Sequence, residues 1–480
     1  MANEIALYRA GEVVGLYDAN DIQSALEDWQ PNDEIWIKEG AVVTNPSCDS
    51  AVIFLTDLAG FQDPAAIMTI RGRKAEGWPN GEGSGDLSII GDSENSANWP
   101  VIDGDGGKLN VECVDFDYEK QYGTLKLRSV VLCDGDDSYY GMGGAAVASV
   151  DMDIVFDGVL IAAAYCSNVN GGWGPVSLYN YNRLISVSGY WLRIQDSVVT
   201  TGCIFGPMAI ASPDISFGSL DIGTLEIANC VSLAQPPADP GMIWITDSDY
   251  FFNKVRILSC ESADMSSGFN FNAHTNTNFR CKHLEITGCK GTYGCTSAVH
   301  PIIMGTGGTG TRIEFDHATI TNNHSPGSAN YGAVCNIMDS GELIFKNSII
   351  YGNTYGDFND VLLSYHDSHG ISASFVNCDM NEYYVCSGGS VTQTDCLNEP
   401  PLFVGSGDYP YQLTEDSPCV DAGVAIADIT EDIIGNPVPQ GKGYDIGAYE
   451  SPYQSGGDVS VLARIDTNVV KRLALTSVSR

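Results

Sequence analysis

Two short acidic turns are the first places in the sequence where side chains could hold a ligand. Asp103-Gly-Asp105-Gly and Asp134-Gly-Asp136-Asp each place two carboxylates on either side of a glycine. Carboxylate oxygens are the ligands that calcium prefers. Neither turn continues into the longer loop with a terminal glutamate that EF-hands use, so ordinary turn chemistry is the alternative. The four aspartates are predicted as a structural calcium site, and no other cofactor is expected.

Aromatic residues are the second group of interest, because several fall between residues 139 and 181 in long connections. An exposed ring offers an apolar face and, in Tyr and Trp, a polar edge, which together suit a sugar. The same residues could instead cover the body of the protein. The predicted glycan-binding residues are Tyr139, Tyr140, Trp173, Tyr179 and Tyr181.

Catalytic residues for polysaccharide chemistry would form a different kind of group. A uronate lyase needs an Arg or Lys base and a cation that stabilises the anion formed beside the carboxylate. A glycoside hydrolase needs carboxylates that face one groove. Acidic residues are abundant, but no local group of either kind stands out in the sequence. We therefore predict no catalytic residue.

The charge balance restricts the partners. The chain has 480 residues, with 23 Lys and Arg against 61 Asp and Glu, and a formal net charge of −38. Nucleic-acid binding relies on clustered cations, so a nucleic-acid partner is not expected. Anionic lipid is disfavoured for the same reason.

A short pattern that recurs nine times must position these groups. Its first and third residues are apolar, its fifth is Gly, Asn, Asp, Ser or His, and its sixth is small. Alternation of this kind predicts a short strand with one buried face, and the fifth residue suits a left-handed bend. The copies begin at Leu125, Ile154, Leu192, Leu225, Val255, Leu284, Ile313, Leu343 and Ala373.

One strand, one bend, a second strand and a return loop in each repeat predict one coil of a parallel β-helix. Adjacent coils should lie ~4.8 Å apart, and roughly ten of them would form a rod about 50 Å long. The small sixth position should point into the core, where free cysteine behaves as a small hydrophobe. The cysteines that fall there, predicted to be buried and reduced, are Cys230, Cys260, Cys289 and Cys378.

The second position of four consecutive copies alternates in charge and should point outward. It is occupied by Arg193, Glu226, Arg256 and Glu285. Opposite charges on neighbouring strands stabilise a sheet by ~0.2–1 kcal/mol per pair. We expect an exposed structural ladder here, in which substitution of Glu226 by Gln has little effect.

The segment before the first repeat predicts a helix that covers the open end of the coil. Ile22, Ala25, Leu26 and Trp29 have the spacing of one helical face, and Pro31 follows. Residues 33–40 then alternate like a first strand. The ends of a β-helix need such covers because they expose unpaired strand edges.

Short motifs at both ends of the sequence recur in the same order in one known family. They are Asp21-Ile-Gln-Ser-Ala-Leu, Pro31-Asn-Asp-Glu-Ile-Trp-Ile-Lys-Glu-Gly, Pro400-Pro-Leu-Phe, Tyr411-Gln-Leu, Ser417-Pro-Cys-Val-Asp-Ala-Gly, Asp432-Ile-Ile-Gly-Asn-Pro and Tyr444-Asp-Ile-Gly-Ala-Tyr-Glu. With them the chain resembles right-handed parallel β-helix proteins of the choice-of-anchor Q type, within the pectate-lyase-like superfold. The resemblance covers about residues 18–451 and implies the fold, whereas most such proteins have no assigned reaction.

The expected fold is therefore all-β, a single-stranded right-handed parallel β-helix with an N-terminal helical cap. Residues 1–40 form the N-terminal segment and capping helix, and residues 41–451 form the β-helix with its closing motifs. Residues 452–480 form a tail that is basic beyond residue 458, with Arg464, Lys471, Arg472 and Arg480 against Asp466. The tail is predicted either to mediate homo-oligomerisation or a larger assembly, or to pack as a strand on its own body.

The expected function is a non-enzymatic structural or adhesive protein displayed outside a cell, most plausibly as a virion component. The alternative is a polysaccharide lyase or glycoside hydrolase. The longest apolar run, residues 158–166, is far shorter than the ~20 residues that a membrane span needs. The first residues show no secretory signal. An extracellular or virion location would then follow from lysis or signal-free export.

Overall fold

The computed structural model describes most of the chain between residues 3 and 454. The residues left out within these limits are 49, 81–86, 88–97, 105–107, 114–121, 136–145, 167–173, 180–184, 201–206, 212–218, 234–241, 247–248, 263–267, 273–277, 292–302, 308–309, 326–334, 340, 356–357, 360, 365–370, 381–382 and 386–389. The tail beyond residue 454, for which we predict an assembly role, lies outside the described residues.

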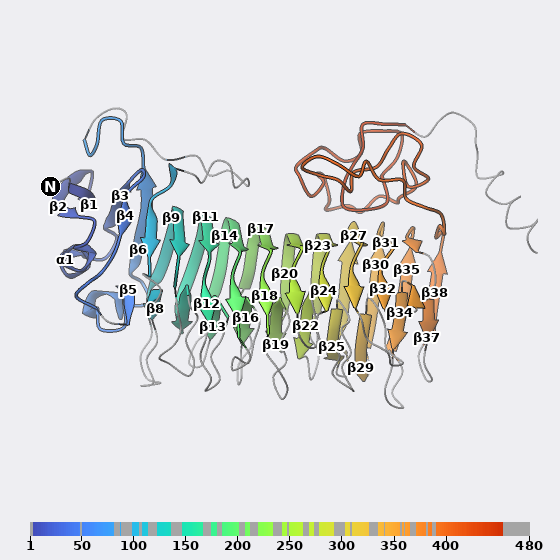
Figure 1. Ribbon diagram of the computed structural model, residues 1–480, viewed down its shortest axis with the longest axis horizontal. Helices are drawn as coiled ribbons and strands as arrows, with labels where there is room; N and C mark the ends of the chain where they lie inside the picture. Colours follow the sequence, from blue (N-terminus) through green and yellow to red (C-terminus); the bar gives the residue numbers. More distant parts are fainter. Residues whose placement is uncertain are drawn as a thin grey trace, which may run out of the picture.

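The protein is a parallel β-solenoid, as the repeat predicts, in which three sheets run along one rod (Figure 1). Among the described residues, sheet A has 19 strands, sheet B has 11 and sheet C has 8. In a central coil, such as residues 153–179, the chain passes from a long strand of sheet A through a short strand of sheet C to sheet B. Equivalent strands of consecutive coils pair in parallel, for example β14 with β17 and β17 with β20. The antiparallel pairs among the described strands are β1–β2, β1–β3 and β32–β33.

The strands of sheet A are β1 (Asn3–Arg9), β2 (Glu12–Asp18), β3 (Glu34–Lys38), β4 (Val42–Val43), β6 (Ile67–Arg73), β7 (Val101–Asp103), β9 (Thr124–Cys133), β11 (Asp153–Ala162), β14 (Ser186–Gln195), β17 (Ser219–Ala228), β20 (Tyr250–Leu258), β23 (Asn278–Thr287), β26 (Arg312–Asp316), β27 (Ala318–Thr321), β30 (Gly341–Lys346), β31 (Ile349–Tyr351), β35 (Ile371–Val376), β36 (Asp379–Met380) and β38 (Ser390–Thr394).

Sheet B contains β5 (Ala51–Phe54), β8 (Leu109–Cys113), β10 (Val147–Val150), β13 (Val176–Tyr179), β16 (Met208–Ala211), β19 (Ile243–Thr246), β22 (Phe269–Asn272), β25 (Ile303–Gly307), β29 (Cys335–Asp339), β34 (Val361–Ser364) and β37 (Tyr383–Val385). Sheet C contains β12 (Tyr165–Cys166), β15 (Val198–Val199), β18 (Val231–Ser232), β21 (Glu261–Ser262), β24 (Lys290–Gly291), β28 (His324–Ser325), β32 (Thr354–Tyr355) and β33 (Phe358–Asn359).

The predicted bends are confirmed at the fifth position of the repeat. All nine residues there have a positive φ, between 42° and 75°, the backbone region that Gly, Asn and Asp tolerate best. They are Ser129, Gly158, Asp196, Asn229, Ser259, Gly288, His317, Asn347 and Asn377. The first and third positions point inward, and their side chains join one continuous core.

The alignment of the nine copies is wrong at two junctions. Ile154 pairs with Val187 rather than with Leu192, and Leu284 pairs with Ala318 rather than with Ile313. A long strand of sheet A carries the same inward alternation on both sides of a bend, about five residues apart. The sequence pattern is therefore satisfied equally well by either half of the strand.

This shift divides the predicted cysteine ladder into two. Cys230, Cys260 and Cys289 occupy one stack, which continues to Asn323, whose side-chain oxygen accepts a hydrogen bond from the Cys289 N–H at 2.9 Å. Cys378 lies in another stack, because its neighbour Asp379 pairs with Ile349. The predicted burial is confirmed for all four thiols, each of which is 0% exposed.

We expect these four thiols to remain unmodified when the native protein is treated with an alkylating reagent, and to react fully after denaturation. Burial raises the pKa of the Cys260 thiol far above its usual value and keeps it protonated. Peptide mass spectrometry measures the modification at each site, with the half-buried Cys48 as the reactive control. A disulfide between Cys230 and Cys260 would contradict this expectation.

The one α-helix among the described residues, α1 (Ile22–Asp28), lies beside β1 and β2 at the start of the rod. Its apolar side chains Ile22, Ala25 and Leu26 are buried, and Trp29 after it joins the same core. A single 3₁₀ turn, η1 (Ala59–Phe61), follows later. Within the described part of the chain, no helix is long and apolar enough to cross a membrane.

The segment that contains the C-terminal closing motifs forms an irregular lobe, residues 397–454. Figure 1 shows this lobe against the flank of the rod, beside the later strands of sheet A. The Asn377 side chain donates a hydrogen bond to the Ala422 carbonyl oxygen, and the Asn347 side chain donates one to the Val424 carbonyl oxygen. The lobe therefore covers the C-terminal part of the outer face of sheet A.

Candidate functional site

The outer face of sheet A is covered near both ends of the rod, and we call the uncovered part between them the window. Near the N-terminal end, Trp99 and Leu87 pack over Val131, Leu160 and Trp191 and form an apolar cluster. Near the C-terminal end, the lobe covers the face. Between these covers, Tyr190 on β14 is 59% exposed and Phe251 on β20 is 36% exposed. The window therefore presents aromatic rings on a rigid sheet.

The lobe is fixed to sheet A by ion pairs at the edge of this window. Asp428 accepts hydrogen bonds from Arg280 at 2.7 Å and lies 3.2 Å from the Lys282 ammonium. The hydrogen bond from Arg280 lowers the pKa of Asp428 well below its ordinary value. Lys254 forms a 2.7 Å ion pair with Glu431. These contacts define one wall of the window.

Backbone groups of the lobe meet a polar row along the bends of sheet A. Asn347 donates to His317 Nε2 at 3.0 Å, which makes Nδ1 the protonated nitrogen that donates to the Gly447 carbonyl oxygen at 3.2 Å. Burial lowers the pKa of His317 to about 4, so the neutral form with this proton arrangement is favoured at neutral pH. The histidine at this repeat position therefore holds the lobe.

The carboxylates of the closing motifs also have structural roles. Asp432 accepts hydrogen bonds from the backbone N–H groups of Asn436 and Glu450, at 2.7 and 3.0 Å. Glu450 in turn accepts the backbone N–H of Gln440 at 2.9 Å. Burial raises the pKa of Glu450 to about 7. The motif acids thus organise the lobe itself.

The predicted charge ladder is confirmed in its pairing, but its predicted exposure is wrong. Arg193 and Arg256 both reach Glu226, at 3.7 and 2.5 Å, and Arg256 also reaches Glu285 at 2.7 Å. Glu226 and Glu285 are each 1% exposed. The Tyr449 hydroxyl of the lobe donates to Glu285 at 2.7 Å. An outward position on the strand became buried because a distant segment folded over it.

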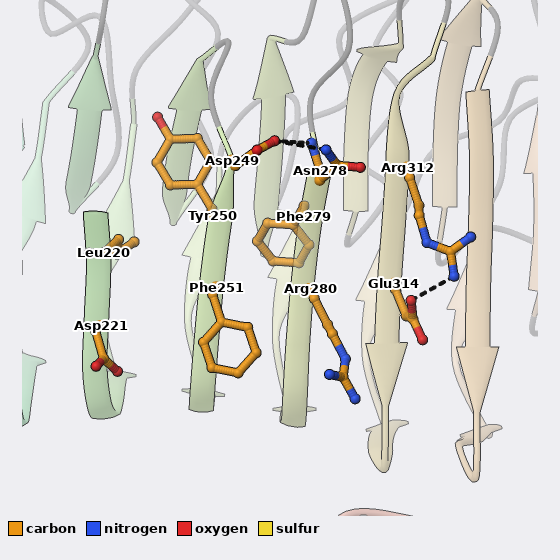
Figure 2. Close-up of a pocket in the computed structure, with 10 residues that line it drawn as sticks. All are labelled: Leu220, Asp221, Asp249, Tyr250, Phe251, Asn278, Phe279, Arg280, Arg312 and Glu314. Atoms are coloured by element: carbon orange, nitrogen blue, oxygen red, sulfur yellow. Dashed lines mark hydrogen bonds and ion pairs between the residues drawn. The ribbon is translucent and has the colours of Figure 1, made fainter. Parts of the chain in front are cut away.

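A groove with a volume of about 540 Å³ opens where β17, β20, β23 and β26 run side by side (Figure 2). Asp249 accepts two hydrogen bonds from Asn278, from its backbone N–H at 2.8 Å and its side-chain amide at 3.0 Å. In Figure 2, Asp221 lies beyond Leu220 on its strand, and the Phe251 ring lies beyond Asp249 and Tyr250 on the next strand. The lining residues are Leu220, Asp221, Asp249, Tyr250, Phe251, Asn278, Phe279, Arg280, Arg312 and Glu314.

Both arginines of the groove are committed to carboxylates. Arg280 pairs with Asp316 at 2.6 Å as well as with Asp428, and the hydrogen bond to Asp428 raises the pKa of Arg280. Burial lowers the pKa of Arg312, but its contacts with Glu314 and Glu342 outweigh this effect and raise it. Neither guanidinium is suited to act as a base. The carboxylates and the Asn278 amide of the groove can form hydrogen bonds with the hydroxyl groups of a ligand, next to the exposed Phe251 ring.

The structure brings together two of the four aspartates predicted to bind calcium. Asp103 pairs with Cys133 across neighbouring strands, and the potential ligand atoms of Asp103, Cys133 and Asp134 all lie within 4.8 Å of one another. Burial and the two carboxylates raise the pKa of the Cys133 thiol to about 12. Asp105 and Asp136 lie outside the described residues. Calcium binding at these turns stays a prediction.

None of the aromatic residues predicted from the sequence is among the described residues that line the groove. Tyr139, Tyr140, Trp173 and Tyr181 lie outside the described residues, as does the side chain of Tyr179, whose backbone ends β13. Their role in glycan binding stays a prediction. Sequence reasoning missed Phe251. The available signal was its place between Tyr250 and Phe252, where strand alternation turns the middle ring outward.

Comparison with known proteins adds no family or relative to this geometry. No family model matches the chain, and none of the curated proteins matches it.

Proposed function

We propose that this protein is a structural or adhesive β-solenoid displayed outside a cell, most plausibly on a virion, and that it binds a neutral glycan in the groove. The observation that carries the proposal is the exposed Phe251 ring, which lines the same groove as the carboxylates of Asp221 and Asp249. A ring of this kind can stack on the apolar face of a sugar. The carboxylates can accept hydrogen bonds from its hydroxyl groups.

The charge of the groove favours neutral over acidic sugars. Its lining contains three carboxylates and two guanidinium groups, and both guanidinium groups form ion pairs. The chain as a whole has a formal net charge of −38, which repels a polyanion. Elimination of a uronate would need a free basic side chain. The two arginines of the groove do not supply one.

A glycoside hydrolase is the second candidate function. The observation that favours it is that Asp221 and Asp249 line the same groove, as a pair of catalytic carboxylates would. Release of reducing ends from a bound glycan, lost in Asp221→Asn, would support hydrolysis. Binding without release supports the adhesive role.

We also infer the finer features that the sequence suggests for the fold and its assembly. These are a right-handed coil, a capping role for α1, and membership of the choice-of-anchor Q type within the pectate-lyase-like superfold. The burial of Ile22, Ala25 and Leu26 against the first coil supports the capping role. A homo-oligomer or larger assembly formed through the basic tail is part of the same proposal. It is supported by the opposite charges of tail and body.

We expect Phe251→Ala to weaken binding of neutral oligosaccharides about tenfold, because it removes one stacking surface. A glycan array followed by calorimetry measures this, with uronate polymers included. Tyr165→Ala is the matched control, since Tyr165 is 46% exposed on sheet C, away from the groove. Tightest binding to uronates, or growth of an unsaturated-uronate absorbance, would overturn the proposal.

A further inference from the structure

Tyr190 is a large exposed aromatic residue that the groove does not include. We propose that the glycan-binding surface continues from Phe251 past Asp221 and Gly223 to Tyr190, so that an extended neutral oligosaccharide lies obliquely across the sheet between two aromatic rings. This inference rests on the proposed function and specifies the length and direction of its ligand.

The strand register places the two rings on one face. Gly189 pairs with Ile222 and Trp191 pairs with Thr224, so Tyr190 stands opposite Gly223 on β17. Phe251 lies on the next strand, β20, and its ring lies under the Lys282 ammonium at 5.0 Å. Thr224 pairs with Lys254, so Phe251 is level with Asp221, two residues before Gly223 on β17. Two strand spacings across the sheet and two residues along the strand separate the positions of the two aromatic residues by ~12 Å, about the span of two to three pyranose units.

Gly223 leaves the surface of β17 opposite Tyr190 free of a side chain. A Cβ atom added there would lie 2.7 Å from the Tyr190 carbonyl oxygen, closer than such atoms can approach. The strand therefore presents bare backbone opposite Tyr190, whereas Asp221, two residues earlier on the same strand, is level with Phe251. A sugar ring could rest on this bare backbone without displacing a side chain.

The backbone turns Tyr190 outward at a fixed position. The register of β11 against β14 is irregular here, and Gly189 has a φ of 147°. A Cβ atom on Gly189 would lie 2.1 Å from the Phe156 carbonyl oxygen, so only glycine fits. The Tyr190 N–H donates to the Asp157 side chain at 3.2 Å. The bulge presents a ring that is 59% exposed on a rigid base.

The charged groups along this path select the ligand class. Asp157 beside Tyr190 and Asp221 beside Phe251 are acceptors for sugar hydroxyl groups and repel carboxylated sugars. Lys282, whose ammonium lies over the Phe251 ring, also pairs with Asp428. The surface thus fits a neutral hexose chain long enough to reach both rings.

The test compares Tyr190→Ala, Phe251→Ala, the double variant and the control Tyr165→Ala, using neutral oligosaccharides of two to six units. Calorimetry gives the affinities, and melting temperatures verify that the variants remain folded. We expect Tyr190→Ala to weaken binding of the longer chains about tenfold and to leave disaccharide binding unchanged. The double variant should lose about a hundredfold for the longer chains.

The outcomes separate this inference from the proposed function. If Phe251→Ala weakens binding while Tyr190→Ala behaves like Tyr165→Ala at every length, the extension is wrong and the groove stands. If neither substitution changes binding, or if the protein binds no neutral oligosaccharide, both proposals fail. A Tyr190 effect that is equal for all lengths would also reject the two-ring arrangement.

Discussion

Replacing Ile257 by Asp is expected to leave no folded protein. Ile257 is 0% exposed and stacks between Ile227 and Ile286 of the neighbouring coils. An unpaired carboxylate in this stack costs several kcal/mol, a large part of the ~5–15 kcal/mol that usually stabilises a domain. In a solenoid the damage spreads, because each coil is stabilised by its neighbours. Soluble yield, circular dichroism and a thermal melt measure the loss.

The control for this substitution is the next residue on the same strand. Leu258 points to the other face and is half-buried, so Leu258→Asp should keep the fold with a modest decrease in melting temperature. The two substitutions differ only in the face they affect. Equal losses would show that the inward register of β20 is wrong.

Replacing Arg256 by Ala is expected to destabilise the protein by about 3–5 kcal/mol, because buried Glu285 loses the cation that it contacts and buried Glu226 keeps only the longer contact with Arg193. Arg256 contacts Glu226 and Glu285, each 1% exposed. Burial lowers the pKa of Arg256, but its contacts with Glu285 and other groups outweigh this effect and raise it. Urea denaturation followed by tryptophan fluorescence gives the change in stability.

Arg312→Ala is the exposed counterpart. Arg312 and its partner Glu342 have side chains that are 40% and 46% exposed, and such pairs contribute about 1 kcal/mol or less. Adding Glu226→Gln and Glu285→Gln to Arg256→Ala should recover part of the lost stability, because no buried charge then remains unpaired. If the added substitutions lower stability further, lost packing rather than buried charge explains the effect.

The repeat shows which features of the fold can be predicted from the sequence. The nine bends follow from local chemistry, since Gly, Asn and Asp adopt positive φ at low cost, and all nine are present. The alignment of Ile154 with Leu192 failed because the alternation of apolar residues is the same on both sides of a bend. Only hydrogen bonding to the neighbouring coil selects Val187 instead.

The candidate site depended on longer-range contacts. The sequence alone determined that this chain is a parallel solenoid with inward apolar rows, left-handed bends and buried cysteines, because each property depends on residues a few positions apart. The tertiary structure decided which outward residues stay exposed. Glu226 and Glu285 are buried in the folded protein, whereas Tyr190 and Phe251 stay exposed in the window. No local pattern separates these pairs, because the cover comes from residues more than 150 positions away, as Tyr449 over Glu285 shows.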